Sequence, residues 1–306
     1  MKVLISGGTG AIGSRLCKML VNRGHAVTIL SRTAKNDSNG FSYSLWNPAK
    51  GEIDHTLAES HDAIINLAGA PVTGRWTKRH KEEILSSRIE STRTLMSLLD
   101  RRPEEKAQRK EARIQAFIGA SAMGYYPNSS ELQREDMPSG NHFLATVCRE
   151  WENASSGAAF YGLRRVIIRI GVVLDTESGM LKTLKPLISS GLLSALGSGR
   201  QYVGVIHIED LCRQFIYALE NPDISGCYNG ACLEAPQNSL LMHEISRAAG
   251  KPFFLPPVPG FVLKLILGEA AEFLLFSFRI RGDSWQKHGF QFLYPTLKDI
   301  LQDLYK

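Results

Sequence analysis

The sequence predicts an α/β fold in which a doubly wound parallel sheet is followed by a smaller C-terminal part. Three observations predict this fold. The chain of 306 residues, 43% of them apolar, is long enough to bury a full core. Apolar strand-like runs alternate with helical periods, and a glycine-rich turn follows the first run. One large or two closely joined domains are therefore expected.

Short apolar runs mark the expected strands, at 2–6, 26–30, 43–46, 62–68, 115–120 and 165–170. Amphipathic helices are expected between them, at about 11–23, 78–100 and 141–156. The charged run 101–113 is expected on the surface, as a solvated helix end or loop. We expect a first domain at 1–173 and a mainly substrate-binding part at 174–306, from which about 201–230 returns to the first domain.

Composition argues against several classes of protein. The net charge of +6 is modest and its basic residues are scattered, which does not favour a nucleic-acid partner. The five cysteines form no C-x-x-C pair, and no export signal opens the chain, so a reducing cytoplasm is expected. The most apolar late segment, 261–278, carries three charged residues, and no membrane span is expected there.

The opening turn "SGGTGAIG", residues 6–13, stands between the first strand and the first helix. Its glycines fit two patterns, G-x-G-x-x-G from Gly8 or G-x-x-G-x-x-G from Gly7, and both continue through Gly10 and Gly13. In a strand–turn–helix, such glycines let the backbone approach a pyrophosphate at the helix N-terminus. The motif therefore predicts a dinucleotide cofactor.

The end of the second strand indicates which dinucleotide is bound. An NAD site usually has an acidic residue here for the ribose 2′-hydroxyl, whereas this chain has Ser31 and Arg32. A guanidinium offers a planar set of donors and a permanent charge to a 2′-phosphate. NADP(H) is therefore the expected cofactor.

A series of motifs resembles one known group over nearly the whole chain, in this order: "SGGTGAIG", "LSR", "NLAGAPVTGRWT", "SSRIESTR", "GASAMGYY", "FLATVCREWE", "RIGVVL", "GSGRQ", "IHIEDL" and "FLPPVPGFVLKLILGE". The chain is similar to the atypical, extended short-chain dehydrogenase/reductases known as epimerase-family or SDR39U-like proteins, some of which carry an old label as cell-division inhibitors. The resemblance implies a Rossmann domain and an epimerase-family oxidoreductase. It also favours the pattern that starts at Gly7.

The resemblance also implies a set of cofactor-binding residues. These are Gly7, Thr9, Gly10, Ala11, Ile12 and Gly13 in the turn, Ser31 and Arg32 at the 2′-phosphate, Leu67, Ala68 and Gly69 after the fourth strand, Glu83 and Arg88 on the following helix, and Val173 at the nicotinamide end.

The usual catalytic pair of the superfamily, a tyrosine with a lysine four residues later, is absent. Leu144 and Cys148 stand at those positions when "FLATVCREWE" is aligned on its last glutamate. Ser121 and Tyr125 are the remaining candidates for holding a substrate oxygen. Cys148 is expected to be a small buried residue rather than a nucleophile.

Two other patterns in the sequence point away from chemistry. The resemblance implies that His207 and Asp210 in "IHIEDL" order the junction between the two parts. No metal site is expected, because the segment "MHEIS" lacks the second histidine of a zinc protease.

Three functions stay open at this point. The first is an NADP(H)-dependent oxidoreductase acting on a small carbonyl or hydroxyl compound. The others are a non-catalytic NADP(H)-responsive binding protein and a nucleotide-sugar epimerase. The missing tyrosine and lysine weaken the epimerase most, because that reaction needs reversible proton transfer at a sugar hydroxyl. A small-molecule substrate is expected, and a homodimer is a further expectation.

Overall fold

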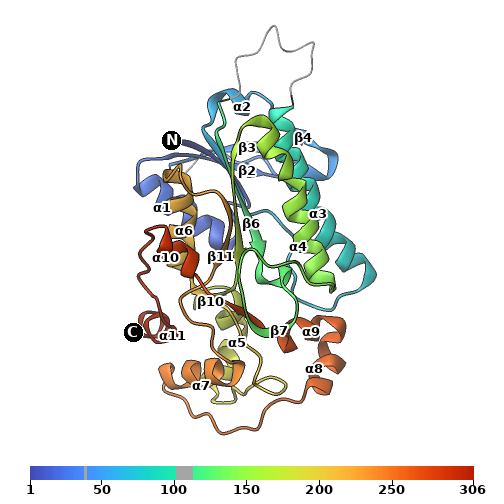
Figure 1. Ribbon diagram of the computed structural model, residues 1–306, viewed down its shortest axis with the longest axis vertical. Coiled ribbons are helices and arrows are strands. Elements are labelled where there is room, and N and C mark those ends of the chain that lie inside the picture. Colours follow the sequence, from blue (N-terminus) through green and yellow to red (C-terminus); the bar gives the residue numbers. More distant parts are fainter. Residues whose placement is uncertain (38–39, 101–112) are drawn as a thin grey trace.

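The computed structural model describes residues 1–37, 40–100 and 113–306. Apart from its last residue, the charged run 101–113 lies outside the described residues. The centre of the molecule is an eight-stranded sheet in the order β11-β8-β6-β5-β1-β2-β3-β4, visible edge-on in Figure 1. Its strands are β1 Lys2–Ser6, β2 Ala26–Ser31, β3 Phe41–Asn47, β4 Glu52–Ile53, β5 Ala63–Asn66, β6 Ala116–Ala122, β8 Arg164–Ile170 and β11 Gly226–Gly230. All neighbours pair in parallel except β3 and β4, which form an antiparallel pair at one edge.

Helices cover both faces of this sheet (Figure 1). On one face lie α1 (Ala11–Asn22) and α6 (Ile208–Glu220), and on the other lie α3 (Lys78–Met96) and α4 (Phe143–Ala154). The alternation of side chains along β1 explains why both faces are covered. Val3 and Ile5 belong to the core under α1 and α6, whereas Leu4 belongs to the core that includes Leu95 of α3.

The later chain adds smaller elements. Its helices are α5 Gly179–Ser189, α7 Asn238–Ala248, α8 Gly260–Leu267, α9 Ala271–Leu275, α10 Asp283–Lys287 and α11 Leu297–Leu304. A third core includes Leu181 of α5, Leu241 of α7 and Leu301 of α11. Two short parallel pairs join β9 Val172–Leu174 to β10 Val205–His207, and β7 Ser129–Gln133 to β12 Phe278–Ile280. The remaining short helices are α2 Leu57–Ser60 and the 3₁₀ turns η1 Pro48–Lys50, η2 Ser97–Leu99, η3 Met123–Tyr125, η4 Ser156–Tyr161 and η5 Gly268–Ala270.

The doubly wound fold is confirmed, and each expected strand is present with ends shifted by two residues or fewer. The late chain also contacts the first part, because α6 packs on α1 and β11 pairs with β8. The domain boundary at residue 173 stays a prediction.

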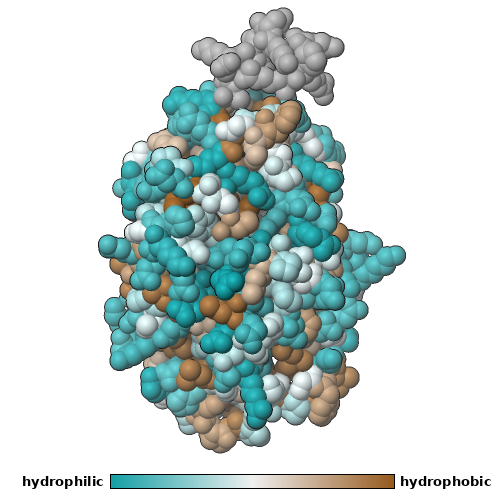
Figure 2. Space-filling view, viewed as in Figure 1, coloured by the Kyte–Doolittle hydropathy of each residue, from teal (hydrophilic) through white to brown (hydrophobic). Residues whose placement is uncertain are grey.

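The apolar segment 261–278 folds as two short helices, α8 and α9, joined by η5. Phe261, Leu265 and Ile266 of α8 are exposed. Most of the face shown in Figure 2 is hydrophilic, and brown apolar side chains gather at the corner where α8 and α9 lie. Within the described ranges, no helix is long and apolar enough to cross a membrane.

Candidate functional site

The residues expected to bind the cofactor gather at one edge of the large sheet. Its strands run in parallel, so their carboxyl ends meet: Ser6 of β1 pairs with Leu30 of β2 and Asn66 of β5, and Ser121 of β6 pairs with Arg169 of β8. The glycine turn and the segments after β2, β5 and β6 all leave the sheet there. In doubly wound sheets this is the edge where ligands bind.

The glycine turn needs glycine for steric reasons. Gly7 has φ +71°, and a Cβ placed there would lie 2.8 Å from the carbonyl carbon and oxygen of Leu67. A Cβ on Gly13 would lie 2.2 Å from the carbonyl oxygen of Gly7, so the first turn of α1 packs directly on the strand end. Both positions exclude a side chain, in agreement with a tight strand–turn–helix.

The N-terminus of α1 is free to accept an anion. Gly10 caps this 12-residue helix in an extended conformation without any side-chain hydrogen bond, and the first turn holds no acidic residue. Thr9, Gly10 and Ala11 are exposed, and Ile12 is half-buried. Unsatisfied N–H groups and the helix dipole together favour a phosphate at such an end.

Ser31 and Arg32 differ in their surroundings. The hydroxyl of Ser31 is buried and donates a hydrogen bond to the carbonyl oxygen of Thr33 at 2.7 Å, so it shapes the turn that follows β2. Arg32 is exposed and makes no ion pair with any described residue. The guanidinium of Arg32 is therefore free to bind an anion beside the edge of the sheet.

Asn66, which the sequence analysis did not single out, organises the loop after β5. Its Oδ1 accepts hydrogen bonds from the hydroxyl of Ser6 at 2.6 Å and from the N–H of Ala68 at 3.2 Å. Its Nδ2 donates to the hydroxyl of Thr92 on α3 at 2.8 Å. Asn66 thus fixes the backbone of Leu67 and Ala68 next to the glycine turn. An asparagine at the carboxyl end of a buried strand was the available signal.

Arg88 and Glu83 are separated by the structure. Arg88 packs against Gly69, where a Cβ would lie 3.0 Å from its Cζ, and donates to the carbonyl oxygen of Ile84 at 2.9 Å. Burial lowers the pKa of Arg88, and no carboxylate of a described residue pairs with it. Glu83 is mostly exposed and lies 3.8 Å from His80. Arg88 therefore lies at the predicted cofactor edge, and Glu83 lies on the helix surface.

A buried ion pair lies beneath the carboxyl end of β6. Ser121 is 2% exposed, and its hydroxyl donates to Oε1 of Glu152 on α4 at 2.7 Å. Nε and Nη2 of Arg169 donate to the two oxygens of the same carboxylate, each at 2.9 Å. Burial alone would lower the pKa of Arg169, but its hydrogen bonds with Glu152 raise it overall. Arg169 and Glu152 were not recognised as partners in the sequence, because they lie 17 residues apart on different elements.

The network continues through Tyr126. Nη1 of Arg169 donates to the phenolic oxygen of Tyr126 at 3.0 Å, and that hydroxyl donates to Oδ1 of Asn229 at 2.7 Å. Tyr126 is fully buried, and burial raises its pKa above the usual range. Tyr126 therefore stays a neutral donor inside the protein and is a structural residue.

The surroundings of Tyr125 differ from those of Tyr126. Its ring centroid lies 3.5 Å from Cζ of Arg169, and its ring meets the edge of Tyr126 with centroids 5.4 Å apart. The side chain is half-buried, and its hydroxyl makes no hydrogen bond within the described part of the chain. Of the two candidates from the sequence, Tyr125 thus has an uncommitted hydroxyl and Ser121 does not.

The positions of the missing pair are filled by buried side chains. Leu144 is 7% and Cys148 3% exposed. Burial raises the pKa of Cys148 to about 11, so the sulfur is a thiol at neutral pH. The structure gives this end of α4 no lysine and no tyrosine.

Val173, His207 and Asp210 lie where the later chain meets the sheet. Val173 is half-buried on β9 and pairs with Ile206 of β10. His207 caps α6, since its Nδ1 accepts from the N–H of Glu209 at 3.1 Å. Asp210 accepts the N–H groups of residues 293 and 294 at 3.0 and 2.8 Å. The hydrogen bonds of these two polar residues tie α6 to the segments around it.

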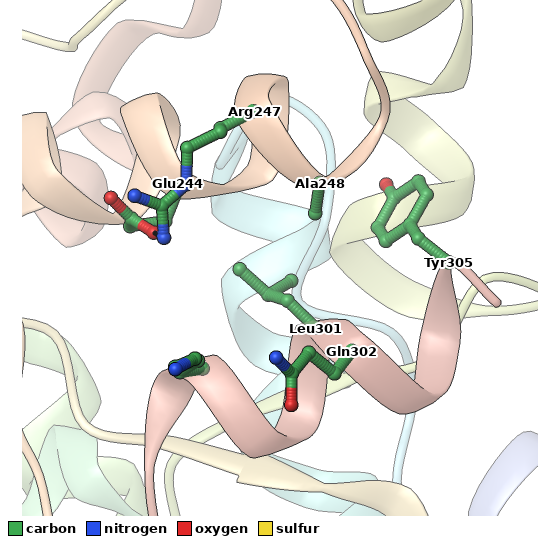
Figure 3. Close-up of a pocket in the computed structure, with 7 residues that line it drawn as sticks. Glu244, Arg247, Ala248, Leu301, Gln302 and Tyr305 are labelled. Atoms are coloured by element: carbon green, nitrogen blue, oxygen red, sulfur yellow. Dashed lines mark ion pairs between the residues drawn. The ribbon is translucent and has the colours of Figure 1, made fainter.

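A cavity of about 290 Å³ lies elsewhere, between α7 and α11 (Figure 3). Its lining includes Arg247, Leu301, Gln302 and Tyr305, and the guanidinium of Arg247 turns back to pair with Glu244. None of the residues expected to bind the cofactor or substrate lines it. Across the residues that the structure describes, no group of three or more His, Cys, Asp or Glu could hold a metal ion.

Comparison with known families identifies the class of protein. Residues 3–229 match the NAD dependent epimerase/dehydratase family, and residues 258–304 match a domain of unknown function, DUF1731. The first match covers more than half of the chain. The chain therefore belongs to this epimerase/dehydratase family, as the motifs of the sequence implied.

Individual relatives lie in the same group. The chain is 34% identical to the chloroplastic epimerase family protein SDR39U1 homolog of Arabidopsis thaliana, over 99% of this chain and 86% of the relative. It is 33% identical to an epimerase family protein of Staphylococcus haemolyticus, over 98% of both chains. The crystal structure of human epimerase family protein SDR39U1 (isoform 2) with NADPH matches with a TM-score of 0.86 and 29% identity, over 100% of this chain and 99% of that one.

Proposed function

We propose that this protein is an NADP(H)-dependent oxidoreductase that acts on a small carbonyl or hydroxyl compound. Two observations at the same edge of the sheet carry the proposal: the N-terminus of α1 has no side-chain cap, and Arg32, after β2, forms no ion pair with a described residue. One site suits a pyrophosphate and the other a 2′-phosphate. The human relative with NADPH supports the same cofactor for this chain.

The chain offers a residue for each part of NADP(H). Backbone N–H groups from Thr9 to Gly13 would hold the pyrophosphate, and Arg32, supported by the turn at Ser31, would hold the 2′-phosphate. Leu67, Ala68 and Gly69 would line the adenine side, and the backbone of Val173 the nicotinamide end. Arg88 is a half-buried cation that pairs with no carboxylate of a described residue, so a cofactor phosphate or ribose would satisfy its remaining donors. Glu83 stays a predicted contact.

At the reaction end, the chain's own residues hold and orient the substrate oxygen. When bound, the cofactor supplies or accepts the hydride at a carbonyl or carbinol carbon. Tyr125, whose hydroxyl is uncommitted, would donate to the substrate oxygen or accept its proton. Ser121 was expected to share this task, but its proton is used for Glu152, and we give it a supporting role. With no lysine beside the tyrosine, turnover is expected to be slow.

A second candidate is a non-catalytic protein that binds NADP(H) and responds to it. The burial of Leu144 and Cys148 at the positions of the usual pair favours this candidate, because neither side chain can move a proton at neutral pH. A nucleotide-sugar epimerase is the third, and the same two residues argue against it. The homodimer and the cytoplasmic location stay predictions.

A screen of carbonyl compounds separates these functions. Reactive aldehydes, dicarbonyls and quinones are offered with NADPH, and its oxidation is followed by absorbance. We expect slow reduction of several compounds, and loss of most of that rate in Tyr125→Phe. If none is reduced although NADPH binds, the binding-protein function replaces the oxidoreductase.

A further inference from the structure

We propose that Arg169 is the positioning residue of the reaction site and that it sets the orientation of Tyr125. The inference rests on the proposed function, because it takes Tyr125 as the group that contacts the substrate oxygen. It adds a role for a buried arginine on β8 that does not itself reach the substrate. The role follows from how its guanidinium is held.

Four hydrogen bonds fix the plane of this guanidinium. Two go to the carboxylate of Glu152, one to the hydroxyl of Tyr126 at 3.0 Å and one to the carbonyl oxygen of Glu135 at 3.1 Å. The acceptors come from α4, from Tyr126 directly after η3, and from the loop after β7. A planar group held at its edge from three sides cannot rotate, and only its two faces stay available.

The ring of Tyr125 lies over the guanidinium, with its centroid 3.5 Å from Cζ. An arginine stacked on an aromatic ring combines electrostatic attraction with contact between two planes. The ring of Tyr126 contacts the ring of Tyr125 on another side, and the angle between the two ring planes is 83°. Arg169 and Tyr126 thereby set the direction in which the hydroxyl of Tyr125 points.

A purely stabilising role is a weaker explanation of the ion pair between Arg169 and Glu152. Removing two ions from water costs much of what their attraction returns, and apolar residues of similar volume stabilise a core equally well. Arg169 is 3% exposed and sits directly beside Ser121 in the sheet register, at the edge where the sequence motifs and the glycine turn meet. The fixed guanidinium plane of Arg169 gives the ring of Tyr125 one orientation, which apolar packing would not do.

The matched control is Arg165, four residues before Arg169 in the sequence. It lies on the same strand, and its guanidinium also bonds α4, through the hydroxyl of Ser155 at 2.9 Å and the carbonyl oxygen of Glu152 at 2.6 Å. Among the described residues, the guanidinium that lies over the ring of Tyr125 is that of Arg169, and Arg165 forms no such cation–π contact. Arg165→Lys therefore imposes a similar loss of strand–helix bonds without touching the stacked ring.

The test uses the full-length protein with 3-fluorotyrosine incorporated, and Tyr125→Phe assigns the fluorine resonance of Tyr125. We compare Arg169→Lys, which keeps the charge but loses the plane, with Glu152→Gln and with Arg165→Lys. We expect the Tyr125 resonance to shift and broaden in the first two and to stay in place in Arg165→Lys. With a substrate from the carbonyl screen, kcat falls about tenfold or more in the first two variants while KM for NADPH changes little.

The outcomes test the positioning role of Arg169 separately from the proposed oxidoreductase function. A folded Arg169→Lys protein whose Tyr125 resonance keeps its parent position and width overturns the positioning role. An equal change in Arg165→Lys overturns it as well, because the effect then belongs to the strand–helix interface. If Arg169→Lys does not fold, Glu152→Gln carries the same comparison. If the parent reduces no carbonyl compound, the oxidoreductase fails while the resonances still decide the role of Arg169.

Discussion

The hydroxyl of Ser121 donates a hydrogen bond to Oε1 of Glu152 at 2.7 Å, and both side chains are less than one-tenth exposed. Glu152 is at the same time the partner of Arg169. A serine hydroxyl has one proton, so Ser121 cannot donate to a substrate oxygen while this bond exists. Ser121, a candidate for holding the substrate oxygen in the sequence analysis, is here part of the buried support.

Ser121→Ala is therefore expected to act mainly on stability. It removes a buried hydrogen bond to a charged group, so we expect a loss of about 1.5–3 kcal/mol in the free energy of unfolding, measured with urea. The effect on kcat is expected to be smaller than that of Tyr125→Phe, which removes a hydroxyl that bonds no described residue. A Ser121→Ala protein that keeps its stability and loses all turnover contradicts this account.

Gly13→Ala is expected to disturb both the fold and cofactor binding. The new Cβ would lie 2.2 Å from the backbone oxygen of Gly7, and backbone cannot move aside as a side chain can. We expect a loss of about 1–3 kcal/mol in stability together with weaker NADPH binding. Gly157→Ala is the control, because nothing lies within 4 Å of a Cβ at that position. If calorimetry shows both variants unfolding at the parent temperature, the close packing of α1 on the turn is wrong.

Cys148→Ala is expected to leave NADPH binding and turnover nearly intact. Burial raises the pKa of Cys148 to about 11, and its sulfur donates to the carbonyl oxygen of Ala122 at 3.7 Å, so the group is an unreactive thiol. Native protein is expected to react slowly with iodoacetamide at this residue. Cys232→Ala, at a buried cysteine whose sulfur donates to the carbonyl oxygen of Glu234, is the matched control. Loss of turnover in a folded, NADPH-loaded Cys148→Ala protein, with Cys232→Ala active, makes Cys148 a catalytic residue after all.

Mild acid is expected to destabilise the protein through His61. Burial lowers the pKa of His61 in the folded chain below the ordinary 6.5. The unfolded chain then takes up a proton at a higher pH than the folded chain does, so stability is complete above about pH 6.5 and falls as the pH drops below it. One such group changes the free energy of unfolding by up to roughly 1.4 kcal/mol for each pH unit.

His61→Gln tests this pH dependence between pH 7.5 and 5.5. Its amide is expected to keep a hydrogen bond to the hydroxyl of Thr28, which His61 Nε2 contacts at 2.9 Å. The slope of stability against pH is expected to decrease in the variant. It does not vanish, because burial also lowers the pKa of His207. An unchanged slope rules out His61 as the source.

The sheet could be predicted from the sequence because each parallel strand is an apolar run between helices, as at 2–6 and 165–170. The short pairs β9–β10 and β7–β12 could not, because β9, β10 and β12 have only three residues each and β7, Ser129–Gln133, is largely polar. The sequence also did not predict that the apolar segment 261–278 is broken at Gly268, which has φ +63°.

The cofactor edge was also predictable, since the glycine turn and Arg32 are local signals with a mechanism. The roles of Ser121 and Tyr125 were not separable in the sequence. They depend on Glu152 and Arg169, which meet through the pairing of β8 with β6 and the packing of α4. The sequence shows those two residues only as parts of helix and strand motifs. The separation of Glu83 from Arg88 likewise depends on the rotation of α3, which periodicity leaves uncertain by a residue or two.

The central claim is that the site is built for NADP(H), and a paired fluorescence titration with NADPH and NADH tests it most directly. Arg32 has a phosphate to bind only in NADPH, so the parent is expected to bind NADPH at least about tenfold more tightly than NADH. Arg32→Asp places a repulsive charge there and is expected to narrow or reverse that preference. Equal affinities of the parent protein for NADPH and NADH would contradict the account.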